Sequence, residues 1–396
     1  MIEVDDARRK IVESTRPVNT TEILNIGDCL GRILAEDILS DIDVPPADNS
    51  SMDGFVVNRK DVSSIPCTLK ISQRIPAGSI PTRLEDGTAA RIFTGAEIPD
   101  NADAVVIQEN CDYTAEEVTI KKRPEPRNNI RPQGQDIQHG ECVLTQGQKL
   151  LPQHIGLLAA VGKPQVSVIK RLRVSILSSG DELTEPGQPL KPGQIYNSNQ
   201  VMLETLLQSL HCDVLIYPTT EDSLEGSIAA FKKAAADSDL VISSGGVSVG
   251  EEDHIKAAVE TLGELSLWKI NLKPGKPLAF GRIDNSKFLG LPGNPVSAFV
   301  TFLLFGVPLI KQLQGQTHAQ QQSFMLPIDF SIEAPRQRPE YVRVKINNNT
   351  VSRFPNQSSG VLSSICWADA LALIPAQQTL TQGDLVEVFP LESLQN

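Results

Sequence analysis

A glycine-rich loop between an apolar run and a helical segment constrains the fold of this chain more than any other feature of its sequence. Residues 240–242 (LVI) have the composition of a buried strand, and we expect a helix to begin at 251–256. Gly245, Gly246 and Gly250 lie between them. A strand that passes through glycines into a helix presents backbone N–H groups that suit an oxyanion. The loop matches neither the Walker A pattern nor GxGxxG, so a tight turn without a ligand is the alternative interpretation.

Size and composition limit the classes of protein to which the chain can belong. Its 396 residues suffice for two to four domains, and the longest apolar stretches are shorter than the ~20 residues of a membrane span. The six cysteines form no CxxC pair, the five histidines are dispersed, and the first residues lack a signal-peptide pattern, so we expect a cytoplasmic protein with reduced thiols and no zinc cluster. A net charge of −12 argues against nucleic-acid binding. An anionic substrate would need a local concentration of positive charge.

The first 145 residues show two different patterns. Residues 1–32 read as a helix, a turn and a second helix. Residues 43–57 form a rigid polar turn, with Asp53-Gly54 before an apolar strand, and the turn holds more hydrogen-bonding side chains than a hairpin needs. Short strands punctuated by proline and glycine then continue to about residue 145, and Thr94 lies at the end of one of them. This region predicts a small all-β domain.

From about residue 172 the pattern alternates between strands and helices, which predicts right-handed βαβ units and a mostly parallel sheet. We expect Asn199 to cap the helix that carries Leu203, Leu206 and Leu210. In open sheets of this kind ligands lie beyond the carboxyl ends of the strands. The residues expected at these ends are Ser179, Asp181, Glu182, Asp222, Ser244, Gly245, Gly246 and Asp253.

Positive charge follows directly after the glycine loop. Lys269, Lys273 and Lys276 surround a Pro-Gly turn, and proline stiffening lets Lys273 and Lys276 face one anion. Asn294 is an expected N-cap, so the N–H groups of residues 296–298 are expected to point outward at a second helix start. A surface turn and an ordinary capped helix are the alternatives. We predict substrate binding by Ser179, Gly180, Asp181, Ser244, Gly245, Gly246, Gly250, Lys276, Pro292, Gly293 and Asn294.

The predicted fold is multidomain, with α/β and β parts. It has a central, mostly parallel α/β sheet domain, a small β insert domain, an α+β linking region and a C-terminal β-barrel-like domain. The expected boundaries are 1–46 plus 146–171 for the N-terminal linking region, 47–145 for the insert, 172–320 for the central domain and 321–396 for the C-terminal domain.

Six motifs along the chain carry a family resemblance: PPADNSSMDGF, RIFTGAEIPDNADAVV, SSGDEL, SSGGVSVGEEDHIK, KPGKPLAFG and LPGNPVSA. In this order, and nearly end to end, the chain resembles the molybdopterin molybdotransferase family of MoeA and the C-terminal domain of gephyrin. The resemblance implies a central domain of the molybdopterin-binding type. It also implies a transferase that inserts molybdate into the dithiolene of adenylylated molybdopterin and releases AMP, with Mg²⁺ as cofactor.

The resemblance also implies roles for particular residues. Predicted catalytic residues are Asp53, Thr94, Glu182, Asp222, Asp253, Lys269, Lys273, Arg343 and Ser359. Asp222 and Asp253 are the predicted metal ligands, since a hard cation prefers oxygen. Lys273, Lys276 and Arg343 suit a tetrahedral dianion such as molybdate. In the family the cleft is shared across a homodimer, so Asp53 and Thr94 would act on the other subunit's site.

The expected partners are a second copy of the chain, a molybdopterin adenylyltransferase, and molybdoenzyme apoproteins or their chaperones, with no nucleic acid and no membrane. Two other functions stay open at this point. One is a molybdopterin adenylyltransferase-type enzyme, which would lack the 49–53 turn and the C-terminal β domain. The other is a catalytically silent dimeric scaffold or molybdopterin-adenylate carrier, against which the presence of Asp53, Asp222, Asp253 and Lys273 argues.

Overall fold

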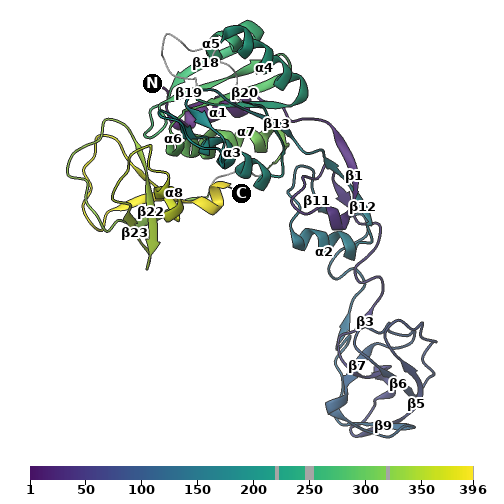
Figure 1. Cartoon of the computed structure of the whole chain (residues 1–396). Coiled ribbons are helices and arrows are strands. Elements are labelled where there is room, and N and C mark those ends of the chain that lie inside the picture. The colour runs from purple at the N-terminus through teal and green to yellow at the C-terminus, as the bar shows by residue number, and fades with distance from the viewer. Residues whose placement is uncertain (219–222, 246–253, 318–321, 396) are drawn as a thin grey trace.

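The computed structural model describes residues 1–218, 223–245, 254–317 and 322–395, which form four parts in an extended arrangement (Figure 1). The central α/β domain packs against the C-terminal β domain. A linking region leads away from the central domain, and the small β domain lies at the far end of this arm. The multidomain α/β and β architecture expected from the sequence is confirmed.

A six-stranded sheet with the order β16-β13-β17-β20-β19-β18 forms the centre of the largest domain. Its first four strands are parallel, and β18 and β19 form an antiparallel edge. The strands are β13 (Arg173–Ser178), β16 (Asp213–Ile216), β17 (Leu240–Ser244), β18 (Gly263–Lys269), β19 (Pro277–Ile283) and β20 (Ser286–Leu291). A short parallel pair, β14 (Leu183–Thr184) and β15 (Ile195–Tyr196), follows β13.

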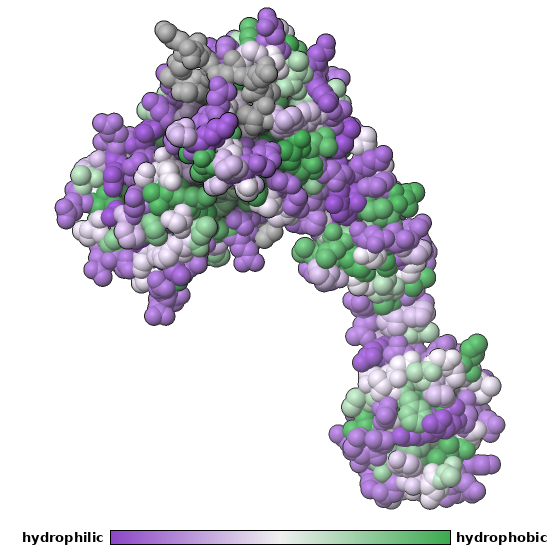
Figure 2. Space-filling model, in the orientation of Figure 1, coloured by the Kyte–Doolittle hydropathy of each residue, from purple (hydrophilic) through white to green (hydrophobic). Residues whose placement is uncertain are grey.

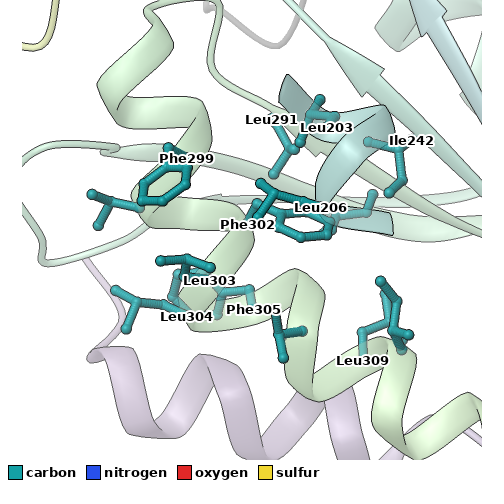
Figure 3. Close-up of a cluster of buried hydrophobic side chains, with 14 of the residues drawn as sticks. Leu203, Leu206, Ile242, Leu291, Phe299, Phe302, Leu303, Leu304, Phe305 and Leu309 are labelled. Atoms are coloured by element: carbon teal, nitrogen blue, oxygen red, sulfur yellow. The ribbon is translucent and has the colours of Figure 1, made fainter. Parts of the chain in front are cut away.

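Helices cover both faces of this sheet. One face carries α1 (Val4–Glu13), α3 (Ser198–Ser209) and the continuous stretch α6 (Pro295–Thr301), η4 (Phe302–Gly306) and α7 (Val307–Leu313), whereas α4 (Leu224–Asp237) and α5 (His254–Leu262) cover the other. Figure 3 shows Phe299, Phe302 and Leu309 of the continuous helix among buried side chains of the first face. Helix Pro295–Leu313 is long and apolar enough to cross a membrane, but 94% of its apolar window is buried inside the protein, as in a core helix.

The linking region contains a strand where the sequence predicted a helix. The second helix expected within residues 1–32 is wrong, because β1 (Thr21–Asn25) pairs with β12 (Gln165–Ile169) in an antiparallel ladder. This long-range partner, and not local propensity, decides the conformation. The same region contains η1 (Ile26–Asp28), the pair β2 (Ile38–Leu39) and β11 (Cys142–Leu144), and α2 (Pro152–Ala160). Helix α1 does not pack in the linking region. It lies against the central domain, where Val4, Ala7 and Ile11 join the main core.

The small β domain is a six-stranded sheet with the order β7-β4-β6-β5-β9-β8. These strands are β4 (Gly54–Val57), β5 (Cys67–Ile75), β6 (Thr88–Ile92), β7 (Ala104–Ile107), β8 (Cys111–Tyr113) and β9 (Glu117–Ile120). The pair β3 (Asn49–Ser50) and β10 (Ile130–Arg131) and two short turns, η2 (Arg59–Asp61) and η3 (Gln108–Asn110), complete it.

The C-terminal domain has an antiparallel sheet with the order β21-β25-β24-β22-β23. Its elements are β21 (Phe324–Pro327), β22 (Glu340–Asn347), β23 (Thr350–Arg353), α8 (Ser363–Trp367), β24 (Ala370–Ile374), β25 (Leu385–Pro390) and α9 (Leu391–Gln395). A bridge between Ile328 and Val351 joins the two edges of the sheet and curls it toward a barrel.

Candidate functional site

A cleft of about 910 Å³ lies where the loops beyond the central sheet face the C-terminal domain. Its lining comprises Ser179, Glu182, Gly245, Lys273, Pro274, Gly275, Lys276, Pro277, Pro292, Gly293, Asn294, Ser297, Arg336, Arg338, Glu340, Val342, Arg353, Pro355, Gln357, Ser358 and Ser359. Five cationic and two anionic side chains are in this set. The cleft therefore concentrates positive charge on a chain whose net charge is −12.

Glycines let the loops after β13, β17 and β20 approach each other closely. Gly245 has φ +93°, and a Cβ built on it would lie 3.5 Å from the carbonyl oxygen of Ser179. A Cβ on Gly293 would lie 3.7 Å from the Cα of Gly245. The three loops thus meet at the carboxyl end of the sheet, where we expected a ligand site.

The side chain of Asn199 joins the end of β17 to the loop after β20. The side chain of Asn197, and not that of Asn199, caps helix α3, which corrects the sequence prediction. The Nδ2 atom of Asn199 donates to Ser244 Oγ at 2.9 Å and to the carbonyl oxygen of Gly293 at 2.7 Å. Ser244, predicted to bind substrate, is buried and holds this contact. Sequence reasoning missed this role of Asn199, because its two partners lie 45 and 94 residues away.

The Lys273–Lys276 turn packs on helix α6. Gly275 has φ +102°, and a Cβ there would lie 2.3 Å from Thr301 Oγ1, a fully buried atom of the helix. Without a side chain at Gly275, the turn can lie directly against helix α6. Lys276 is exposed and Lys273 is half-buried at the cleft. Lys273 Nζ forms an ion pair with Glu340 at 3.0 Å.

The start of α6 is less open than the sequence suggests. Asn294 occupies the N-cap position, but its side chain accepts no capping hydrogen bond. The N–H of Val296 donates to the carbonyl oxygen of Ser359 at 3.0 Å, and that of Ala298 donates to the carbonyl oxygen of Asn294 at 2.8 Å. The expectation that these N–H groups point outward is therefore wrong for Val296 and Ala298. The Val296–Ser359 bond instead ties a loop of the C-terminal domain to the central domain.

Arg343 lies behind the cleft wall. It is fully buried, and its Nε donates to Ser364 Oγ and its Nη2 to the carbonyl oxygen of Ser358, both at 3.1 Å. Burial lowers the pKa of Arg343 to about 10, and Glu340 acts in the opposite direction, so the guanidinium is charged at neutral pH. Gln357 holds the same loop by pairing with both the N–H and the carbonyl of Arg343 at 3.0 Å. Arg343 therefore orders the loop that places Ser359 in the cleft.

Asp53 and Thr94 form a second cluster, in the small β domain. They flank the paired strand ends Gly54 and Ile92. Asp53 Oδ1 accepts from the N–H of Thr94 at 2.8 Å and from its hydroxyl at 2.9 Å. These two hydrogen bonds hold the pKa of the exposed Asp53 carboxyl below its ordinary value. Within one chain this cluster lies at the opposite end of the molecule from the cleft (Figure 1).

The remaining predicted residues divide into three groups. Gly180 and Asp181 lie in the same loop as Ser179 and Glu182, after β13. Lys269 ends β18, is exposed and does not line the cleft. Asp222, Gly246, Gly250 and Asp253 lie outside the described residues. Among the residues that the structure does describe, no group of three or more His, Cys, Asp or Glu side chains could hold a metal ion.

The C-terminal domain contributes charged residues that sequence reasoning did not select. Arg336, Arg338, Glu340 and Arg353 all line the cleft. Arg338 Nη1 also donates to the carbonyl oxygen of Leu272 at 2.8 Å, across the domain boundary. The run RQRPE (336–340), whose last residue is the first of β22, was the available signal, because three charged residues crowd the start of an apolar strand.

Comparison with known proteins agrees with this architecture. Residues 2–162 match the MoeA N-terminal region (domain I and II), residues 175–312 a probable molybdopterin-binding domain, and residues 326–391 the MoeA C-terminal region (domain IV). The molybdopterin molybdenumtransferase of Haemophilus influenzae is 45% identical over 80% of this chain and 78% of its own length. That of Nostoc sp. is 35% identical over 94% of this chain and 89% of its own length.

A solved structure covers almost the whole molecule. The molybdopterin biosynthesis MoeA protein of Pyrococcus horikoshii superposes with a TM-score of 0.85 at 32% identity, covering 98% of this chain and 99% of its own. The domain order, the fold and the sequence identity agree along the full length. The chain therefore belongs to the molybdopterin molybdotransferase (MoeA) family.

Proposed function

We propose that this protein is a transferase of molybdenum cofactor biosynthesis that inserts molybdate into the dithiolene of adenylylated molybdopterin and releases AMP. The observation that carries this proposal is the cationic cleft between the central and C-terminal domains, with Lys273, Lys276 and Ser359 in its lining. Both substrates are anions, and cleavage of a phosphoanhydride requires that its charge be neutralised. The family membership supports the same reaction.

The residues of the cleft would act mainly by binding and orientation. Lys273 and Lys276 supply point charges, and the Ser359 hydroxyl can donate a hydrogen bond to an oxyanion. The close-packed loops at Ser179, Gly245 and Gly293 form the wall on the central side. Holding two anionic substrates side by side in such a cleft lowers the entropic part of the barrier.

The proposed function includes a Mg²⁺ ion bound by the carboxylates of Asp222 and Asp253. Asp222 and Asp253 follow strands β16 and β17 in the chain, and carboxylate oxygens suit a hard cation. When bound, Mg²⁺ would supply neutralisation of the charge on the anhydride.

We also propose that the working unit is a homodimer in the cytoplasm, with a molybdopterin adenylyltransferase and molybdoenzyme apoproteins or their chaperones as partners. Asp53 and Thr94 are too remote from the cleft of their own chain to reach it, so a second subunit would have to present them. Hydrophobic residues reach the surface along the linking region (Figure 2), among them Ile23, Leu30 and Leu39, each at least half exposed. Such exposed apolar residues suit a contact between subunits.

The proposal is tested in cells that lack their own molybdotransferase. The wild-type chain should restore molybdoenzyme activity, and a Lys273→Ala variant should not, although it accumulates to the same level. The matched control is Lys345→Ala, which removes a lysine of β22 that lies outside the cleft. Restoration of activity by the Lys273→Ala variant would refute the assignment of this cleft as the active site.

A further inference from the structure

Glu340 is a nearly buried carboxylate at the boundary between the central and C-terminal domains. Its side chain is only 3% exposed, although it borders the cationic cleft. Burial of a carboxylate costs free energy unless the carboxylate is paired with cations. The partners of Glu340 therefore indicate its role.

Each oxygen of Glu340 faces a different cation. Oε1 lies 3.0 Å from Lys273 Nζ of the central domain, and Oε2 lies 3.5 Å from Arg336 Nε of the C-terminal domain. The side chains of Lys273 and Arg336 are 45% and 40% exposed, and both line the cleft. The Arg336 Nε atom is itself buried and makes no hydrogen bond within the described part of the chain, so the charge of Glu340 at 3.5 Å offsets the cost of its burial.

The main chain around Glu340 fixes the same lysine. The N–H of Lys273 donates to the carbonyl oxygen of Pro339 at 3.0 Å, and the N–H of Tyr341 donates to the carbonyl oxygen of Lys273 at 2.8 Å. Lys273 is thus held by its backbone and by its side chain to three consecutive residues of the C-terminal domain. Little conformational freedom remains to be lost when an anion binds.

Two cations placed close together repel each other, and a carboxylate between them removes much of that cost. An ammonium group has three donors and a guanidinium five, so each cation keeps donors for a ligand after contacting Glu340. Because the carboxylate is 3% exposed and the side chains of the two cations are 45% and 40% exposed, a ligand in the cleft meets the positive groups first.

We infer that Glu340 is a positioning residue that holds Lys273 and Arg336 as one receptor for a doubly charged oxyanion, and that Arg336 binds this anion together with Lys273. The inference rests on the proposed function for the identity of the anion, which is either molybdate or the phosphoanhydride of the nucleotide substrate. It adds two residues, Glu340 and Arg336, to the machinery of the cleft.

The inference makes a prediction opposite to that of simple charge counting. Replacing Glu340 by Gln removes a negative charge from an anion site, which by Coulomb's law alone should tighten anion binding. If Glu340 positions the two cations, the same change lets them move apart and weakens anion binding. The sign of the change in Kd therefore separates the two accounts.

The test uses the full-length protein and its Glu340→Gln, Arg336→Gln and Lys273→Met variants, together with the Lys273→Met/Arg336→Gln double variant and the triple variant that adds Glu340→Gln. Calorimetry measures the Kd of molybdate alone and of AMP alone, and the ligand whose Kd changes is the anion that the receptor binds. We expect Glu340→Gln and Arg336→Gln each to weaken that Kd by about tenfold, the size of one lost charge-assisted contact. Glu340→Gln should have no further effect once Lys273 and Arg336 are both replaced. Glu333→Gln, an exposed carboxylate of the preceding segment, is the matched control and should bind as the wild type does.

Tighter or unchanged binding in the folded Glu340→Gln variant overturns the inference. If this variant fails to fold, Arg336→Gln decides, because the Arg336 side chain is 40% exposed and Glu340 keeps Lys273 as a partner, so this variant should still fold. Unchanged affinity for both anions in Arg336→Gln then overturns the inference. These measurements need no turnover, so a wild-type protein that binds anions but does not release AMP would refute the proposed function without deciding this one.

Discussion

Gly275 shows how a single residue places the two lysines of the cleft. Its φ of +102° favours glycine, and a Cβ would lie 2.3 Å from the Oγ1 atom of Thr301, which cannot move away because it is buried in a helix. We expect Gly275→Ala to shift the turn that carries Lys273 and Lys276. A displacement of this kind should lower kcat/KM for AMP release by about ten- to a hundredfold.

Gly193 provides the matched control for this prediction. It also has a positive φ, +86°, but a Cβ there would meet no atom within 4 Å. Gly193→Ala should cost stability through backbone strain, about 1 kcal/mol by urea unfolding, and leave kcat/KM unchanged. Equal losses of activity in both variants would mean that backbone strain, and not the contact with Thr301, disturbs the site.

Local signals were sufficient for some residues of the site and not for others. Lys273, Lys276, Gly245 and Gly293 could be predicted because their motifs combine glycine, proline and lysine within a few positions. Glu340 could not, because its role depends on a lysine 67 positions earlier in the chain and on the docking of two domains. Such partners become visible only when the domains are placed relative to each other.

At the scale of elements, the continuous helix Pro295–Leu313 supports the site from behind. Its first part, α6, holds Val296 against Ser359 and Thr301 against Gly275, and its remaining length is buried in the main core. Leu309 is fully buried there, so we expect Leu309→Ala to cost about 2–5 kcal/mol of unfolding free energy. Leu385→Ala, at a position 59% exposed, should change stability by less than about 0.5 kcal/mol. A similar cost for both substitutions in urea unfolding would contradict this account of the core.

Elements were predictable where their stabilisation is local or strongly periodic. The alternating strands and helices of the central domain follow apolar runs bounded by glycine and polar residues, and the sheet formed by them has the expected parallel part. Strand β1 was missed because the residues of its partner, β12, lie 140 to 148 positions further along the chain. A segment of five residues with weak alternation carries too little information to reveal such pairing.

At the scale of the whole molecule, the two clusters of predicted catalytic residues lie in different parts of an extended chain. The central cleft contains Lys273 and Ser359, and the small β domain contains Asp53 and Thr94 (Figure 1). If a site combines the two clusters across a dimer, a hybrid of an Asp53→Ala subunit and a Lys273→Ala subunit has one intact site. We expect such hybrids, purified by two different tags, to show about half of the wild-type activity, whereas each homodimer of a variant is inactive. An inactive hybrid would mean that the two clusters do not cooperate across subunits.

The central claim is that the cleft catalyses molybdate-dependent release of AMP, and a single-turnover reaction tests it most directly. Purified protein is mixed with adenylylated molybdopterin, molybdate and Mg²⁺, and AMP and reconstitution of an apo-molybdoenzyme are followed in time. The account predicts that AMP appears only when molybdate is present and that the product activates the apoenzyme. Tight binding of the nucleotide without molybdate-dependent AMP release would contradict it, and would make the protein a carrier or scaffold.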